Sequence, residues 1–187
     1  MKERRRIRYL RALKGWPALL IFSIVLGGCQ AQEPPLSQGA AAFKQEVQEC
    51  LVRLSGGLAG PVAKGDRAAI NEAITKIEPD AVKLCRMCPF RIAVLDRQGE
   101  TLTIYPFKQD AMGNYSNYEV VTRTLKTRKI SQQRLYLQDG AKIYAVCVPL
   151  LKGEELLGIL VLSLDSQEAQ KRWGITQKEF LALDLNK

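Results

Sequence analysis

The segment that begins at residue 39 has the spacing of an amphipathic helix. Apolar side chains recur every three or four positions up to about residue 56, and charged side chains occupy the opposite face. Two pairs, Gly56-Gly57 and Gly60-Pro61, then interrupt the pattern, so we expect the helix to end there. Asp66 is placed to cap a second helix, whose apolar side spans residues 69–77. The sequence therefore predicts a helical region over residues 39–87.

From residue 90 onward the apolar positions alternate with polar ones, which is the pattern of strands. Turn signals at Gly99 and at Asp139-Gly140 join consecutive strands into hairpins. The last strand segment, 156–164, is apolar on both faces, which favours a central place in the sheet. The five predicted strands are 91–96, 101–105, 133–137, 142–148 and 156–164.

Helical patterns lie between and after these strands. Residues 118–126 have helical spacing in the middle of the strand region, and Thr176 with Glu179 forms a capping box for the last helix. The order of elements predicts an α+β fold with a five-stranded antiparallel sheet of order 2-1-5-4-3 over residues 90–165. We expect the N-terminal helices to cover one face of this sheet and short C-terminal helices to occupy residues 166–184.

The 187-residue chain has a formal net charge of +9, but most of this charge lies near its N-terminus. Residues 1–15 hold seven basic residues and one acidic residue, whereas the rest of the chain is close to balanced. A nucleic-acid partner is therefore not expected. The sequence contains no histidine, which excludes Ser-His-Asp and Cys-His catalysis and imidazole-ligated zinc or haem. We predict no catalytic residue, no metal site and no cofactor, and therefore no enzyme.

The N-terminal segment has the layout of an export signal. After the basic stretch comes an apolar run over residues 16–26, which is too short to span a bilayer that needs roughly 20 apolar residues. The next residues, Leu26-Gly27-Gly28-Cys29, resemble the lipobox of bacterial lipoproteins. This resemblance implies that residues 1–28 are a signal peptide, that Cys29 becomes the lipidated first residue, carrying acyl chains such as palmitate, and that residues 29–38 include a tether. An uncleaved anchor, or an ordinary signal peptide with a chance cysteine, is the alternative interpretation.

The same resemblance implies a location in the bacterial cell envelope. A protein held by lipid on Cys29 has the membrane as a partner, and we expect its domain over residues 39–187 to face the periplasm. Gln30 favours the outer membrane, because lipoprotein sorting in many Gram-negative bacteria uses Asp in that position for inner-membrane retention.

The strand region resembles the extracytoplasmic Cache sensor domains, whose sheet is PAS-like. The resemblance rests on four segments, VLDRQGETLTIYP at 94–106, NYSNYEVVTRTLKT at 114–127, RLYLQDGAKIYAVCVPL at 134–150 and LLGILVLSLD at 156–165. It implies a sensor or binding module for a small ligand. Cache domains usually sit between two membrane-spanning helices and drive a cytoplasmic output, whereas we predict no second membrane segment here, so we expect a separate membrane-bound signalling protein as partner. A structural or assembly lipoprotein that keeps the fold but lacks a ligand pocket is the alternative.

Aromatic and cationic side chains concentrate in the region that lines the pocket of a Cache domain. Five tyrosines lie between residues 105 and 144, and Tyr115 is one of them. A cationic group among several phenols suits a small carboxylate or another polar ligand, because arginine binds a carboxylate through two parallel hydrogen bonds. Half-buried residues at the rim of the sheet are the alternative interpretation. The candidate ligand-binding residues are Tyr105, Tyr118, Arg123, Arg134, Tyr136 and Tyr144.

Four cysteines remain besides Cys29, an even number that suggests disulfides in an exported protein. They are Cys50, Cys85, Cys88 and Cys147, and the sequence leaves their three pairings open. Cys85 and Cys88 form a C-x-x-C motif, for which metal binding or redox chemistry is the alternative to a structural disulfide or a buried thiol.

Overall fold

The computed structural model describes residues 35–84, 91–105, 112–137 and 140–187. These residues all belong to one unit, Pro35–Lys187, whereas Cys29, Cys85 and Cys88 lie outside the described residues. Within the described ranges, no helix combines the length and the apolar character that are needed to cross a bilayer.

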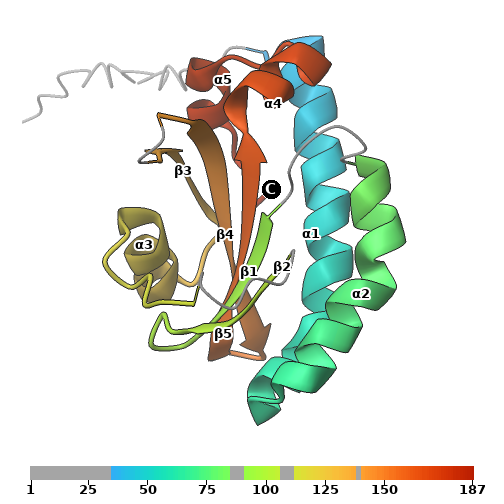
Figure 1. Ribbon diagram of the computed structural model, residues 1–187. Coiled ribbons are helices and arrows are strands. Elements are labelled where there is room, and N and C mark those ends of the chain that lie inside the picture. The colour runs from blue at the N-terminus through green and yellow to red at the C-terminus, as the bar shows by residue number, and fades with distance from the viewer. Residues whose placement is uncertain (1–34, 85–90, 106–111, 138–139) are drawn as a thin grey trace, which may run out of the picture. The chain divides into compact units, whose positions relative to one another are not determined.

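The described chain folds into five helices and five strands in the predicted order. The elements are α1 (Gln38–Lys64), α2 (Arg67–Leu84), β1 (Arg91–Asp96), β2 (Thr101–Tyr105), α3 (Glu119–Thr127), β3 (Ser131–Tyr136), β4 (Lys142–Lys152), β5 (Glu155–Asp165), α4 (Ser166–Trp173) and α5 (Gln177–Ala182). The strands form one antiparallel sheet in the order β2-β1-β5-β4-β3, which confirms the predicted topology (Figure 1). β5 is the central strand, as its two apolar faces predicted.

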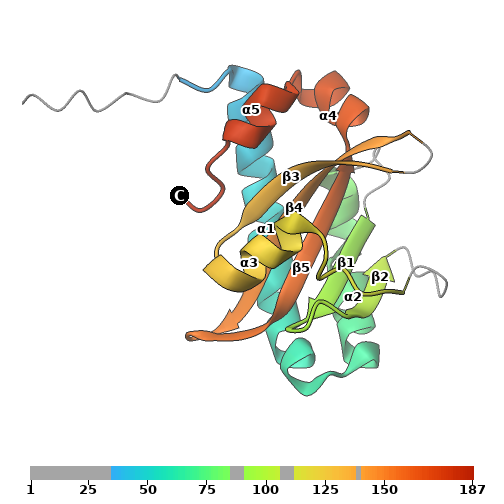
Figure 2. The same cartoon turned by 90° about the vertical axis from the view of Figure 1, so that its left-hand side faces the viewer.

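Helices cover the two faces of the sheet unequally. α1 and α2 lie against one face, as predicted, and the shorter α3 lies against the other (Figures 1 and 2). The main core lies between α1 and the sheet, where Phe43, Leu54 and Leu58 are fully buried in one cluster with Leu160 and Leu162 of β5. A smaller cluster lies between α3 and the opposite face. The α1 face is therefore filled by core side chains, and α3 covers the other face with a smaller group of residues.

α1 continues through the glycines and the proline that were expected to end it, and it stops at Lys64. The reason is that Leu58 and Val62 extend its apolar stripe by two turns and are both buried. Burying each of these side chains contributes about 1.5–3 kcal/mol, which is comparable with the cost of about 1 kcal/mol for an interior glycine and about 3 kcal/mol for an interior proline. Gly65 then ends the helix with a φ of 63°, in the left-handed conformation that favours glycine.

The start of α1 packs against the end of α4. The ring of Phe43 meets the ring of Trp173 edge-on, with 5.1 Å between the ring centroids. Glu46 accepts hydrogen bonds from Nη2 of Arg172 and from Nε1 of Trp173, each at 3.1 Å. A Cβ atom at Gly39 would lie 1.7 Å from the carbonyl oxygen of Trp173, so this close approach requires glycine. These contacts fix the first turns of α1 to α4.

The start of α1 is also bonded to α5. Thr176 and Glu179 form the predicted capping box, in which Oγ1 of Thr176 accepts from the Glu179 backbone N at 3.2 Å and Oε2 of Glu179 accepts from the Thr176 backbone N at 2.9 Å. The Ser37 hydroxyl caps α1 by accepting from the Ala40 backbone N, and it also donates to the Glu179 carboxylate. The bond from Ser37, followed by those from Thr176, lowers the pKa of Glu179 to about 2.

Gly158 of β5 lets β1 and α1 approach its Cα atom closely. A Cβ atom there would lie 2.3 Å from the carbonyl oxygen of Leu95 and 3.0 Å from Cγ1 of Val62. We therefore expect Gly158→Ala to lower the free energy of unfolding by about 2 kcal/mol or more, because backbone of β1 would have to move. The matched control is Gly56→Ala on α1, where a Cβ atom would meet nothing within 4 Å. That change should stabilise the protein by about 0.5–1 kcal/mol, and equal stability of the two variants in urea denaturation would contradict this account.

The low pKa of Glu179 predicts a pH-dependent contribution to stability. Its folded-state pKa of about 2 lies below the ordinary value of 4.5, so the carboxylate stabilises the fold above pH 4.5, and this contribution is lost as the pH falls toward 2. Glu179→Gln should therefore lower the melting temperature at about pH 6, and the difference from the wild type should shrink toward zero near pH 2. Thermal melts followed by circular dichroism measure this difference. A difference that stays constant across this range would show that the carboxylate charge plays no part.

Candidate functional site

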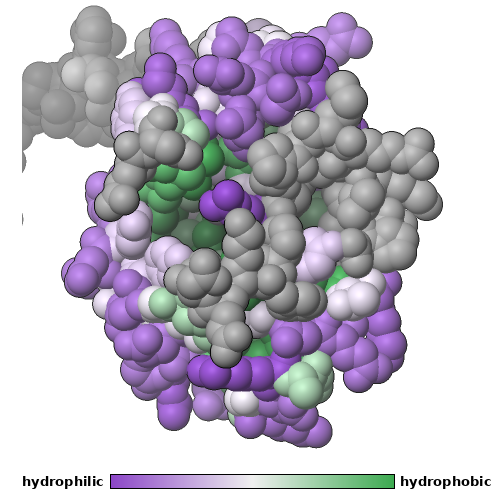
Figure 3. Space-filling view, in the orientation of Figure 1, coloured by the Kyte–Doolittle hydropathy of each residue, from purple (hydrophilic) through white to green (hydrophobic). Residues whose placement is uncertain are grey.

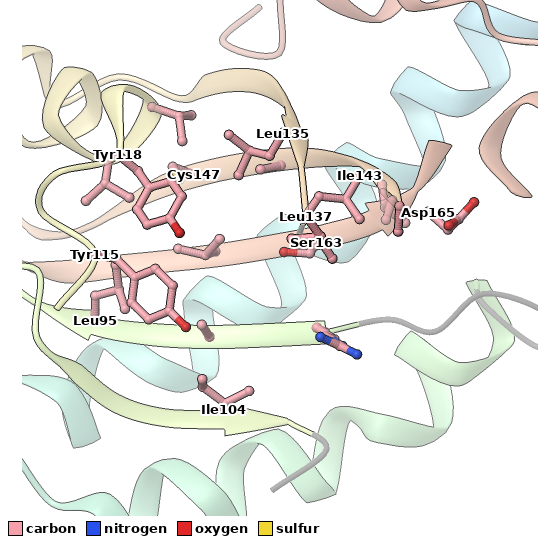
Figure 4. A pocket seen from close by; sticks show the side chains of 18 residues that line it. Leu95, Ile104, Tyr115, Tyr118, Leu135, Leu137, Ile143, Cys147, Ser163 and Asp165 are labelled. Atoms are coloured by element: carbon pink, nitrogen blue, oxygen red, sulfur yellow. The ribbon is translucent and has the colours of Figure 1, made fainter. Parts of the chain in front are cut away.

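A cavity of about 360 Å³ lies between α3 and the face of the sheet opposite α1 (Figure 4). Residues of all five strands or their adjoining turns line it, and α3 with the segment before it forms a wall. In the space-filling view, hydrophobic residues line a recess that is surrounded by hydrophilic ones (Figure 3). The cavity is therefore an apolar hollow on the face that the main core does not fill.

Small side chains make this face of the sheet hollow. Strand alternation places Ala93 of β1, Ala145 and Cys147 of β4 and Ser163 of β5 on the same face. The register pairs Ala145 with Ser163, and it places Val161 between Ala93 and Cys147, so these residues are neighbours. Because alanine, cysteine and serine occupy these neighbouring positions, space remains beneath α3.

The segment between β2 and α3 is fastened to the β1–β2 hairpin, and this fixes the position of Tyr115. The Tyr115 backbone N donates to the Gly99 carbonyl oxygen at 2.9 Å, and the Thr101 backbone N donates to the Gly113 carbonyl oxygen at 3.1 Å. Gly99 has a φ of 83°, in agreement with the predicted turn, and a Cβ atom there would lie 2.9 Å from Ser116. Glycine at this position therefore serves both the turn and the close packing of the segment.

Two phenol groups point into the cavity from its wall (Figure 4). The ring centroids of Tyr115 and Tyr118 lie 5.6 Å apart, and Tyr118 is 45% exposed, which places it at the mouth of the cavity. Burial raises the pKa of the Tyr115 hydroxyl and the neighbouring Tyr118 raises it further, while Arg91 lowers it. The Tyr115 hydroxyl therefore stays protonated at neutral pH and can donate a hydrogen bond to a ligand.

Charged groups line the cavity near the start of β1 and the end of β5. Arg91 begins β1 directly opposite Ser163, and Asp165 follows two positions later on the same face of β5. Oδ1 of Asp165 accepts hydrogen bonds from the backbone N atoms of Gln167 and Glu168 at 2.8 and 3.1 Å, and it thereby caps α4. Among the described residues, no carboxylate forms an ion pair with Arg91. Its guanidinium is therefore placed to meet an acidic group of a ligand.

Of the six residues predicted to bind a ligand, only Tyr118 lines this cavity. Arg123 is exposed on α3 and forms an ion pair with Glu119, with 2.5 Å between Nη2 and Oε1. Tyr105 of β2 is half-buried and packs against the core beneath α1. The structure thus keeps Arg123 and Tyr105 away from the hollow face.

The other three candidates, Arg134, Tyr136 and Tyr144, share one face of the sheet, but it is the face opposite the cavity. The ring of Tyr144 stacks on Phe180 of α5, with 4.0 Å between centroids. Arg134 donates hydrogen bonds to Gln177 of α5 and to the Tyr136 hydroxyl. Strand periodicity shows which side chains lie together but not which face is hollow. The residues one position further back along each strand face the other way, and on β3 and β4 these include Leu135 and Ile143, which line the cavity.

Three polar residues of the cavity, Arg91, Ser163 and Asp165, were not among the predicted site residues, and Tyr115 was noted only as one of a group of tyrosines. A sequence signal for them was present. Alanine, serine and cysteine recur at alternate positions of strands that otherwise carry bulky side chains. Small residues at alternate positions indicate the face of the sheet that is left open. The polar residues at the same alternating positions point to that face, and they are then the site candidates.

The two described cysteines, Cys50 and Cys147, are buried free thiols. Cys50 lies in the core beneath α1 and Cys147 in the cavity floor, on opposite faces of the sheet, so this fold does not pair them with each other. Burial raises the pKa of Cys50 to about 11, against an opposing effect of Arg53, and that of Cys147 to about 12. Pairings that involve Cys85 or Cys88 stay predictions. Within the described residues, no group of cysteine and carboxylate side chains is arranged to hold a metal ion.

No model of a known protein family and no curated protein sequence matches this chain. Several solved structures have a similar fold. The extracellular domain of vpHK1S-Z8, described as a histidine kinase, superimposes with a TM-score of 0.58 at 11% identity, over 75% of this chain and 57% of that one. The sensor domain of the histidine kinase DctB from V. cholerae gives a TM-score of 0.51 at 17% identity, over 73% and 61%. The ligand-binding domain of the amino acid chemoreceptor PctC from Pseudomonas aeruginosa PAO1, in complex with GABA, gives 0.50 at 16% identity, over 71% and 58%.

This chain spans about three fifths of the length of each of these structures. At identities of 11–17%, the similarity concerns the fold and not the individual site residues. All three proteins are named as extracellular, sensor or ligand-binding domains. The sheet order, the helices on its two faces and these superpositions agree, and the chain therefore has the α+β fold of the Cache/PAS-like extracellular sensor domains.

Proposed function

We propose that the mature protein is a lipid-anchored binding module that faces the periplasm, holds a small ligand in the cavity beneath α3 and acts through a separate membrane-bound signalling protein. The observation that carries this proposal is the cavity, whose volume is about 360 Å³ and whose lining includes Arg91, Tyr115 and Tyr118. Ligand pockets generally have volumes of roughly 300–1,000 Å³ and present a few polar groups among apolar side chains. The cavity matches this description, which supports a small molecule as its ligand.

The lining favours a small organic acid with an apolar body. Arg91 offers a planar cation that binds a carboxylate through two hydrogen bonds, and the Tyr115 hydroxyl offers a further donor. Ala93, Cys147 and Val161 provide an apolar floor on which the rest of the molecule would lie. Among the described residues that line the cavity Arg91 is the only cation, and this cation above an apolar floor supports a ligand with a single carboxylate.

The anchor and the partner are proposed from the sequence and the fold together. The lipobox-like segment ending at Cys29 supports lipidation. The similarly folded domains of vpHK1S-Z8 and DctB come from histidine kinases, and that of PctC from a chemoreceptor, which supports a sensory role here. Acyl chains reach into one leaflet, so a signal that crosses the bilayer needs a spanning partner. We propose no catalytic role for this module.

Substitutions in the cavity test the ligand site. In a thermal-shift screen against small monocarboxylic acids, the wild type should gain melting temperature with at least one acid. Arg91→Ala should weaken binding of that acid by about 10- to 100-fold, because a hydrogen bond to a charged group contributes about 1.5–3 kcal/mol. Ala145→Leu should abolish the shift by filling the floor of the cavity.

The matched control is Arg123→Ala, which removes the same charge from an exposed position on α3 outside the cavity lining. This variant should keep the wild-type affinity. Binding that survives Arg91→Ala and Ala145→Leu but is lost in Arg123→Ala would place the ligand elsewhere. A failure of every acid to shift the wild type would favour the structural or assembly lipoprotein.

Cys29→Ser tests the lipid anchor. The wild-type mature chain should begin at Cys29 and carry the added mass of acyl chains, whereas the variant should carry none and should leave the membrane fraction or stay unprocessed. Mass spectrometry of the purified protein, combined with membrane fractionation, measures both effects. Cys50→Ser is the control, because Cys50 is a buried thiol of the domain, and its loss should not change the acylation. A Cys29→Ser protein that is processed and membrane-bound like the wild type would rule out the anchor.

A further inference from the structure

Exposed apolar side chains gather at the end of the domain that carries α5. Three of the large apolar side chains that the described residues expose lie there: Leu36 at 40%, Tyr136 at 61% and Leu181 at 46%. α4 and α5 lie at the end where α1 begins, and the α1–α2 turn lies at the opposite end (Figures 1 and 2). These exposed side chains therefore lie at the end of the domain where α1 begins, directly after the predicted tether.

Hydrogen bonds hold these side chains around α5. Leu36 precedes Ser37, whose hydroxyl donates to Glu179 of α5. Leu181 lies on the exposed side of α5 together with Lys178, three positions earlier. Tyr136 is joined to α5 through Arg134, which bonds to both the Tyr136 hydroxyl and Gln177. The three apolar side chains therefore surround one short helix.

The tether is too short to let this end turn away from the bilayer. Ser37, which is bonded to α5, lies eight positions after Cys29, so the span is at most about 29 Å and averages about 16 Å for a flexible chain. A domain of this size has a radius of gyration of about 15 Å. Because even the extended tether is shorter than the diameter of the domain, the α5 end stays on the side of the domain that is nearer to the membrane holding Cys29.

Lysine side chains accompany the apolar ones at this end. Lys142 lies opposite Tyr136 in the sheet, Lys171 lies in the last turn of α4, and Lys178 lies on α5, and all three are exposed. Among the described residues, none of the three forms an ion pair. Long cationic side chains beside leucine and tyrosine suit the boundary between phosphate headgroups and acyl chains.

We propose that the α5 end, formed by Leu36, Tyr136, Lys178 and Leu181, docks on the surface of a phospholipid bilayer. The two leucines and the tyrosine reach the boundary between headgroups and acyl chains, and Lys178 contacts the lipid phosphates. This inference rests on the proposed lipidation of Cys29, because the tether length sets which end faces the membrane. Docking holds the domain upright, with the β4–β5 hairpin directed away from the bilayer.

Energy transfer from Trp173 to labelled lipid tests the docking. Trp173 is the only tryptophan of the mature chain and lies at the end of α4, close to the proposed surface. The mature lipoprotein is placed in vesicles of phosphatidylethanolamine and phosphatidylglycerol that contain dansyl-labelled phosphatidylethanolamine. Leu36→Glu with Leu181→Glu should lower the transfer efficiency by about twofold or more, because the domain then moves out to the length of its tether.

Val52→Glu is the matched control, since Val52 is 72% exposed on α1 and receives the same change from apolar to acidic. It should leave the transfer unchanged, and circular dichroism should show that all variants are folded. If Cys29 is acylated and vesicle-bound but the double variant transfers like the wild type, docking is overturned while the anchor stands. If mass spectrometry finds no acyl chain on Cys29, both proposals fall. A loss of transfer that accompanies the break-up of a dimer in size-exclusion chromatography would identify a second copy as the occupant and overturn lipid docking.

Discussion

Each side chain of the sheet must face either α1 or α3, and this division decides what the rest of the protein can do. Strand alternation sends Tyr144 and Val146 toward the α1 core and Ala145 and Cys147 toward α3. The first pair belongs to a set of large residues that closes against a long helix, whereas the second belongs to a set of small residues that leaves space. Stability therefore comes chiefly from one face, and the other face is available for a ligand.

The sequence predicted the fold well because its signals are local. Gly99 specifies its turn by itself, and the apolar run of β5 specifies a central strand whatever else surrounds it. The site was harder, because Arg134 and Tyr144 do lie together, yet only packing by α1 and α5 shows that their face is full. The length of α1 was misjudged for a related reason: local helix propensity favours an end near Gly56, while the burial of later residues on the sheet overrides it.

The cavity and the start of α1 are joined through the short helix α4 and the hydrogen bonds at its two ends. Asp165 lines the cavity and, through two backbone hydrogen bonds, caps α4. The far end of α4 is packed on the start of α1 through Glu46, Trp173 and the space that Gly39 provides. Two contact regions separated by an eight-residue helix therefore connect the site with the start of α1, and every link is a described contact.

Burial of the Cys147 thiol in the cavity floor lowers its chemical reactivity. Cys147 is fully buried, and this burial raises the pKa of its thiol to about 12, so the side chain is a neutral thiol at neutral pH. Oxidants and electrophiles react with the thiolate, and the neutral thiol is nearly inert toward them. The side chain that most resembles a reactive group therefore serves as a neutral, apolar part of the cavity floor.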